Sequence, residues 1–93
     1  MNADQICAAI KARRVLRFRY KGSFRKVEPH ALGYDGDMLT LSAWQLSGGS
    51  GVEFRDFNVA KLTELATTGE TFARARSGYN PNDRTLSRVL CRL

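Results

Sequence analysis

Hydrophobic positions near the start of the chain recur with the spacing of a helix. Ile6, Ala9 and Ile10 lie three or four residues apart, so a helix would place them on one face. Asp4 is of a residue type that caps a first turn, because its side-chain oxygen accepts from a free backbone N–H group. The pattern predicts a helix over about 4–14.

The period falls to two at about residue 15, which is typical of strands with one buried face. Leu16, Phe18 and Tyr20 occupy alternate positions, with arginines between them. The dipeptide Asp35-Gly36 favours a tight hairpin turn, because glycine adopts positive φ without steric cost. Five short strands are expected, over about 16–20, 24–28, 38–46, 52–57 and 62–67.

Two interruptions fall inside this β-rich part. Pro29 has no N–H group for a strand ladder, which indicates an edge or a bulge. The glycine- and serine-rich stretch 47–51 offers no side chain that packs, and it lacks the spacing of a phosphate-binding loop. We expect it to be a mobile connection.

Helical signals return near the C-terminus. Asn80, Pro81 and Asp83 are the residue types found at the cap, first position and first turn of a helix. They predict a second helix over about 81–92, whose apolar face holds Leu86, Val89, Leu90 and Leu93.

The expected fold class is therefore mainly β (α+β). Ninety-three residues make one domain, 1–93, because a chain of this length supports a single core. Closing the five strands into a small barrel over about 15–72 would hide the edges that an open sheet exposes.

Charge adds a hint about partners. Fifteen Lys and Arg residues outnumber nine Asp and Glu residues, and basic side chains concentrate at both ends of the sequence. This distribution favours an anionic partner, either a small ligand or an oligonucleotide, although a solvated basic face is an equal alternative. No apolar run approaches the length of a membrane span, so no membrane partner is expected.

The sequence offers little for catalysis or metal binding. Cys7 and Cys91 lie far apart and belong to no metal-ligand motif, so they are expected to be reduced, buried thiols. The N-terminus lacks a signal-peptide pattern, which favours a cytoplasmic location. His30 is the only histidine and reads as a turn residue. We therefore expect no enzyme activity, no metal site and no cofactor.

The chain resembles the WYL domain, a ligand-sensing module of bacterial transcriptional and phage-defence regulators. The resemblance covers about residues 5–72. It rests on four motifs that occur in the same order as in the family: Leu16-x-Phe18-x-Tyr20, Arg25-x-Val27-Glu28-Pro29, Arg55-x-Phe57 and Lys61-Leu62. The tripeptide that names the family falls on Leu39-Thr40-Leu41, so its Trp and Tyr are missing.

This resemblance implies an Sm-like, SH3-type barrel that binds an anionic, nucleotide-like ligand in a basic pocket. The ligand-binding positions it implies are Tyr20, Arg25 and Arg55, with Lys61 where the family usually has arginine. The family usually carries a DNA-binding domain as well, which points to a separate DNA-binding partner protein here.

Three alternatives stay open at this point. Arg25 and Arg55 are equally suited to internal salt bridges with Glu28, Glu53 or Asp56. A second function is non-specific nucleic-acid binding by the basic N-terminal face, formed by Arg13, Arg14, Arg17 and Arg19. A third is homodimerisation through Trp44 and the apolar face of the C-terminal helix, although Trp44 is rather expected to pack on that helix.

Overall fold

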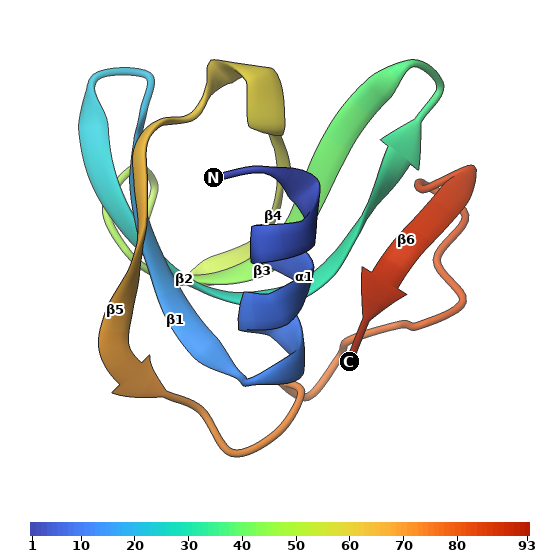
Figure 1. The fold of residues 1–93 in the computed structure, drawn as a ribbon. Coiled ribbons are helices and arrows are strands. Elements are labelled where there is room, and N and C mark those ends of the chain that lie inside the picture. Colours follow the sequence, from blue (N-terminus) through green and yellow to red (C-terminus); the bar gives the residue numbers. More distant parts are fainter.

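The computed structural model describes all 93 residues, and strands form most of it (Figure 1). One helix precedes the strands, and a short 3-10 helix lies between the fourth and fifth. The elements are α1 (Ala3–Lys11), β1 (Arg14–Tyr20), β2 (Ser23–Asp35), β3 (Met38–Ser47), β4 (Glu53–Asn58), η1 (Val59–Lys61), β5 (Thr63–Thr71) and β6 (Arg88–Arg92). The prediction of a mainly β fold is confirmed.

Helix α1 is confirmed, but its cap differs from the predicted one. The Asn2 side chain accepts from the Gln5 N–H group, and the Gln5 side chain accepts from the Asn2 N–H group. This capping box satisfies two free backbone N–H groups, and Asp4 lies within the first turn and not at the cap. The helix ends at Lys11, and its nine residues are far fewer than the roughly 20 needed to cross a membrane.

The sheet is antiparallel, with the strand order β4-β3-β2-β1-β5. Its end strands β4 and β5 do not pair with each other, so the predicted barrel is not closed. The sheet curves around α1 instead (Figure 1), and Ile6, Ala9 and Ile10 on the helix fill the concave side. The helix thus covers the apolar face that strand closure would otherwise cover.

Strand β2 is long enough to pair with two strands along one edge, while β3 pairs along the other. Its first half pairs with β1, and its second half, Ala31–Tyr34, pairs with β6. The register with β3 shifts between Pro29 and Ala31, which confirms a bulge at the proline. Because of this shift, the next core position after the bulge is Leu32.

The predicted C-terminal helix is wrong, because residues 88–92 form strand β6. The free half of β2 offers unpaired backbone groups, and pairing with them outweighs a weak local helix preference. Val89 and Leu90 are consequently exposed on β6 and do not form the expected apolar helix face.

The expectation of reduced thiols is also wrong. Cys7 on α1 and Cys91 on β6 form a disulfide, although 84 positions separate them in the sequence. The return of β6 along β2 brings the C-terminus beside α1 (Figure 1), which is the cause of this pairing.

Candidate anion site

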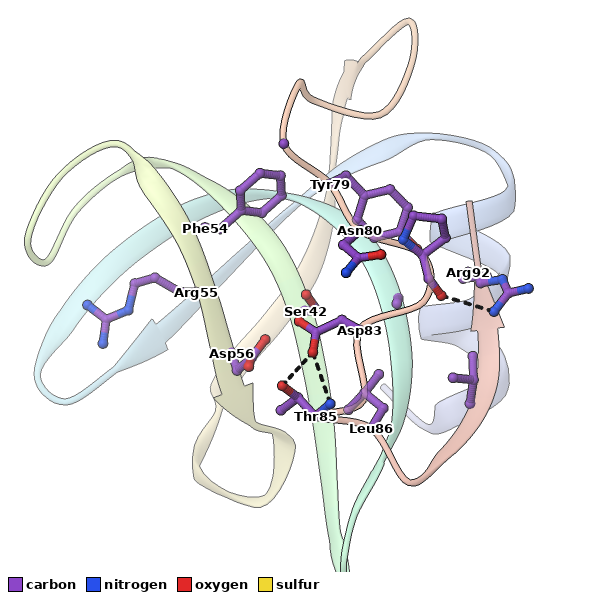
Figure 2. Close-up of a pocket in the computed structure, with 14 residues that line it drawn as sticks. Ser42, Phe54, Arg55, Asp56, Tyr79, Asn80, Asp83, Thr85, Leu86 and Arg92 are labelled. Carbon is purple, nitrogen blue, oxygen red and sulfur yellow. Dashed lines mark hydrogen bonds between the residues drawn. The ribbon is translucent and has the colours of Figure 1, made fainter.

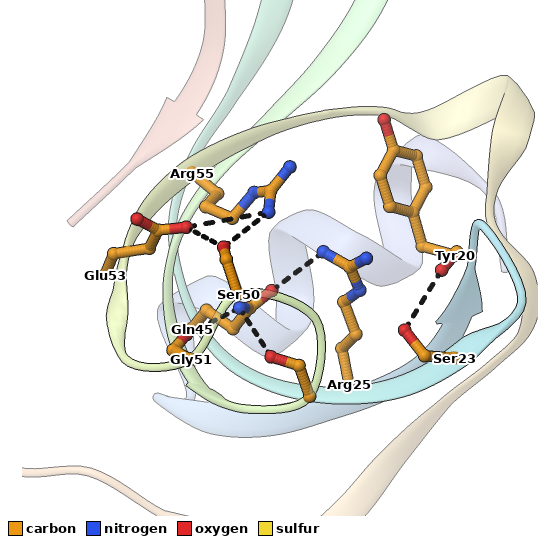
Figure 3. A network of polar contacts seen from close by, with 9 residues as sticks. Tyr20, Ser23, Arg25, Gln45, Ser50, Gly51, Glu53 and Arg55 are labelled. Carbon is orange, nitrogen blue, oxygen red and sulfur yellow. Dashed lines mark hydrogen bonds and ion pairs between the residues drawn. The ribbon is translucent and has the colours of Figure 1, made fainter.

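Tyr20, Arg25 and Arg55 lie on the face of the sheet that also forms the core. Arg25 is opposite the buried Phe18 on β1, and Tyr20 is the next residue of β1 on that face. Arg55 and Phe57 are two positions apart on β4, so their side chains lie on this same face. The guanidinium carbons of Arg25 and Arg55 lie 6.0 and 5.8 Å from the centre of the Phe57 ring. The structure therefore brings together three of the four predicted ligand residues (Figure 3).

Arg25 is the most unusual of these residues, because its charge is buried without an acidic partner. The residue is 5% exposed, and its guanidinium carbon lies 4.9 Å from the centre of the Tyr20 ring. Its Nη1 donates to Gln45 Oε1 at 3.1 Å, while its buried Nε has no hydrogen-bond partner. Burial lowers the pKa of the guanidinium, and the nearby Arg55 lowers it further.

Arg55 is held more loosely and is partly exposed. Its Nη1 donates to Ser50 Oγ at 3.0 Å and lies 3.6 Å from Glu53 Oε1. The alternative of an internal salt bridge is thus confirmed for Arg55 with Glu53, and it does not involve Asp56. Such a long, half-exposed ion pair is worth about 0–1 kcal/mol, so it leaves Arg55 able to exchange partners.

Tyr20 serves mainly as a wall of the site. The residue is 8% exposed, and its ring meets the Phe57 ring edge-on, with 5.2 Å between centres. Its hydroxyl carries no bond to the residues around the site in Figure 3. Lys61 lies in η1, is exposed, and makes none of the contacts that join the other three residues. It therefore stands apart from the cluster.

Gln45 completes the cluster and was not predicted from the sequence. It is fully buried: its Oε1 accepts from Arg25, and its Nε2 donates to the carbonyl oxygens of Gly48 and Gly51, at 2.9 and 2.6 Å. The glycine-rich stretch expected to be mobile is therefore tied to the site. One signal was available, because Gln45 follows Leu41 and Ala43 at the inward-facing positions of β3.

Glu28 does not pair with Arg25, as one alternative had it. It forms a bidentate ion pair with Arg76, at 2.7 and 2.9 Å, on the opposite face of the sheet. Trp44 lies beside Glu28 on this face and contacts both the Arg76 guanidinium and Phe54. Trp44 thus packs against the C-terminal segment as expected, but that segment is irregular there and not helical.

His30 belongs to the same outer cluster. It is fully buried in β2, and its ring contacts Phe54, Phe72 and Tyr79. Its Nε2 accepts from the backbone N–H group of Arg76 at 3.0 Å. His30 is therefore a packed core residue of a strand, and the prediction of a turn residue is wrong.

A pocket of about 220 Å³ lies between β4 and the C-terminal segment (Figure 2). Asp56, Asp83 and Arg55 are among the residues that line it, although the end of the Arg55 side chain points away from the two carboxylates (Figure 2). Neither Tyr20 nor Arg25 lines it. The pocket therefore adjoins the cluster around Arg25 only through Arg55.

The basic N-terminal residues lie on the surface. Arg13, Arg14, Arg17 and Arg19 are all exposed. Phe24, which is 47% exposed, lies between the guanidinium groups of Arg17 and Arg19, at 5.6 and 5.2 Å from its ring centre.

Comparison with known families shows to which family the domain belongs. The sequence model of the WYL domain matches residues 1–67, which hold α1, the first four strands and all four predicted ligand residues. Neither the curated proteins nor the solved structures that were compared gave a match. WYL domains are generally regulatory, ligand-sensing modules. Because the match covers well over half of the sequence, this chain belongs to the WYL domain family.

Proposed function

We propose that the chain is a ligand-sensing module that binds an anionic, nucleotide-like ligand at Arg25, Arg55 and Tyr20. One observation carries the proposal: Arg25 is buried, lacks an acidic partner and has an unpaired Nε. Leaving a buried charge unpaired costs several kcal/mol, so proteins seldom retain one without a use. A phosphate group would supply both the missing charge and the missing acceptor.

The chemistry of the two arginines suits such a ligand. A guanidinium presents parallel N–H groups that match two phosphate oxygens, and charge-assisted bonds of this kind are about twice as strong as neutral ones. Glu53 is the only carboxylate paired with either arginine. An incoming anion would displace this weak contact and bind between two cations.

Fluorescence anisotropy with a short labelled oligothymidylate, competed by cyclic nucleotides, tests the proposal. Arg25→Met and Arg55→Met keep most of the side-chain volume and remove the charge. Each should weaken binding by about tenfold or more, since a hydrogen bond to a charged group contributes about 1.5–3 kcal/mol. Arg84→Met is the matched control, because Arg84 is exposed and makes no ion pair. Equal affinity of all four proteins would refute the site.

A second candidate is single-stranded nucleic-acid binding by the outer face of the β1–β2 hairpin. The specific observation is the exposed Phe24 ring between Arg17 and Arg19. Exposed aromatic rings stack on bases of any sequence, and flanking cations attract the phosphates. Arg19 also pairs with Glu64 at 3.7 Å, but Arg17 has no acidic partner.

The two contributions on this surface predict different responses. Phe24→Ala should lower affinity for the oligothymidylate at every salt concentration by about 1–3 kcal/mol. Arg17→Gln should reduce the slope of log affinity against log salt by about 0.7 between about 50 and 200 mM. Met38→Ala, which truncates an equally exposed apolar residue elsewhere, is the control. A salt-independent affinity, or Phe24→Ala behaving like Met38→Ala, would rule out this surface.

A further inference from the structure

The loop between β3 and β4 presses directly on Arg25. A Cβ atom on Gly49 would lie 2.6 Å from both Cζ and Nη1 of Arg25 and 2.9 Å from its Nη2. The Gly49 backbone therefore covers the face of the guanidinium. A Cβ atom on Gly48 would lie 2.2 Å from the Phe24 carbonyl oxygen. Only residues without a side chain approach β2 this closely.

The same loop also engages Arg55. Ser50 accepts from Arg55 Nη1 at 3.0 Å, and its hydroxyl donates to Glu53 (Figure 3). One short loop thus occupies a donor of one arginine and covers the face of the other. Moving it would free both guanidinium groups together.

Gln45 fastens the loop in this position. Its Nε2 holds the carbonyl groups of Gly48 and Gly51, and the Gly51 N–H group donates to the Gly48 carbonyl at 3.0 Å. Its Oε1 occupies Arg25 Nη1, a donor that a bidentate anion needs. The Gln45 amide therefore occupies a donor that the ligand would use, and it also holds the loop against β2.

We propose that residues 48–52 form a self-inhibiting lid on the anion site, latched by Gln45, which competes with the ligand for Arg25 and Arg55. This inference rests on the proposed function of the same site. The closed loop covers the guanidinium face and takes the bonds that an anion would make, so binding requires the lid to lift. The affinity observed is reduced by the fraction of molecules in which the lid is closed.

The glycines supply a pair of matched variants. Gly48→Ala places a methyl group against the Phe24 carbonyl oxygen of the β2 backbone, which cannot turn aside as a side chain can, and so prevents closure. Gly51→Ala is the control, because Gly51 also has positive φ, +104° against +89° for Gly48, but no atom lies within 4 Å of its Cβ position. The control shares the backbone strain without the clash.

Two readouts on the full chain test the lid. Without ligand, the side-chain amide hydrogens of Gln45, which hold the Gly48 and Gly51 carbonyls, should exchange at least several-fold faster in Gly48→Ala than in Gly51→Ala. With inorganic pyrophosphate as the probe, Gly48→Ala should bind several-fold more tightly than wild type, and Gly51→Ala should bind within about twofold of wild type.

Each other outcome contradicts a defined part of the account. Unchanged exchange in Gly48→Ala would show that the close approach of the glycine to β2 does not hold the loop closed. Faster exchange with equal or weaker pyrophosphate binding would show that the loop does not compete with the anion. In both cases binding by wild type leaves the proposed function standing. Absence of pyrophosphate binding in all three proteins would overturn the lid and the anion site together.

Discussion

The hydrogen bonds of His30 fix its protonation state. Nε2 accepts from the Arg76 N–H group, so the proton must lie on Nδ1, which donates to the Glu28 carbonyl oxygen at 2.8 Å. A positively charged ring would lose the bond from Arg76, because Nε2 would then carry a proton. Burial lowers the pKa of His30, consistent with a neutral ring.

This arrangement predicts a loss of stability in mild acid. Since the folded pKa lies below the unfolded one, the unfolded chain binds more protons as pH falls. The contribution of His30 is complete above about pH 6.5 and is lost as pH falls toward the folded pKa, by at most about 1.4 kcal/mol per pH unit. Urea unfolding at about pH 7.5 and 5.5 measures it.

His30→Gln provides the comparison, because His30 is the only histidine. The free energy of unfolding should fall with acidification more steeply in wild type than in this variant. Asp56, whose pKa burial raises, acts in the opposite direction but is common to both proteins. Identical pH dependence of the two proteins would show that His30 does not need to be neutral.

At the scale of elements, the sequence pattern predicted those helices and strands whose own residues show a clear period. The helix spacing of Ile6, Ala9 and Ile10 and the alternation in β1 were read correctly. Strand β6 was not, because its partner is the half of β2 that lies some 60 positions earlier in the sequence. The prediction of a closed barrel was wrong for a similar reason, since no local sequence pattern shows whether β4 pairs with β5.

The residues of the candidate site also differ in how far the local sequence could predict them. Residue type and resemblance predicted Tyr20, Arg25 and Arg55 as ligand residues, and the fold brings these three together. The role of Gln45 depends on Arg25, which lies 20 positions away, and on glycine carbonyls that face it only in the folded loop. A polar residue at an inward-facing strand position was the one local sign of that role.

The Cys7–Cys91 bond joins α1 to β6, two elements at opposite ends of the chain. A cross-link that closes a long loop restricts the unfolded chain, and removing one of this kind costs about 2–5 kcal/mol. The Cys7→Ser, Cys91→Ser double variant should therefore unfold at lower urea concentration than oxidised wild type. A thiol reductant should lower the stability of wild type to that of the variant and leave the variant unchanged.

Thiol titration of the folded protein completes this test. The oxidised wild type should show no reactive thiol before or after unfolding. Two thiols that appear on unfolding without reductant would show that the bond does not form.

At the scale of the whole molecule, the open sheet gives each face a different role. Helix α1 covers the concave face at one end, and the loop after β3 covers Arg25 at the other. The C-terminal segment covers the opposite face through Arg76, which contacts Glu28, Trp44 and His30. This segment, residues 72–93, lies beyond the residues matched to the WYL domain, and its Arg76 pairs with Glu28 on the face opposite Arg25.

The central proposal is that the buried Arg25 guanidinium binds an anion. Its Nε–H group reports on this directly, because it has no partner in the protein. In ¹H–¹⁵N spectra of arginine-labelled protein, pyrophosphate should shift the Arg25 Nε resonance saturably, and Arg25→Met should identify that resonance by its absence. The Arg84 resonance should stay unmoved. An Arg25 resonance that does not respond while the exposed arginines shift together would contradict the account, because it would place the anion on the surface.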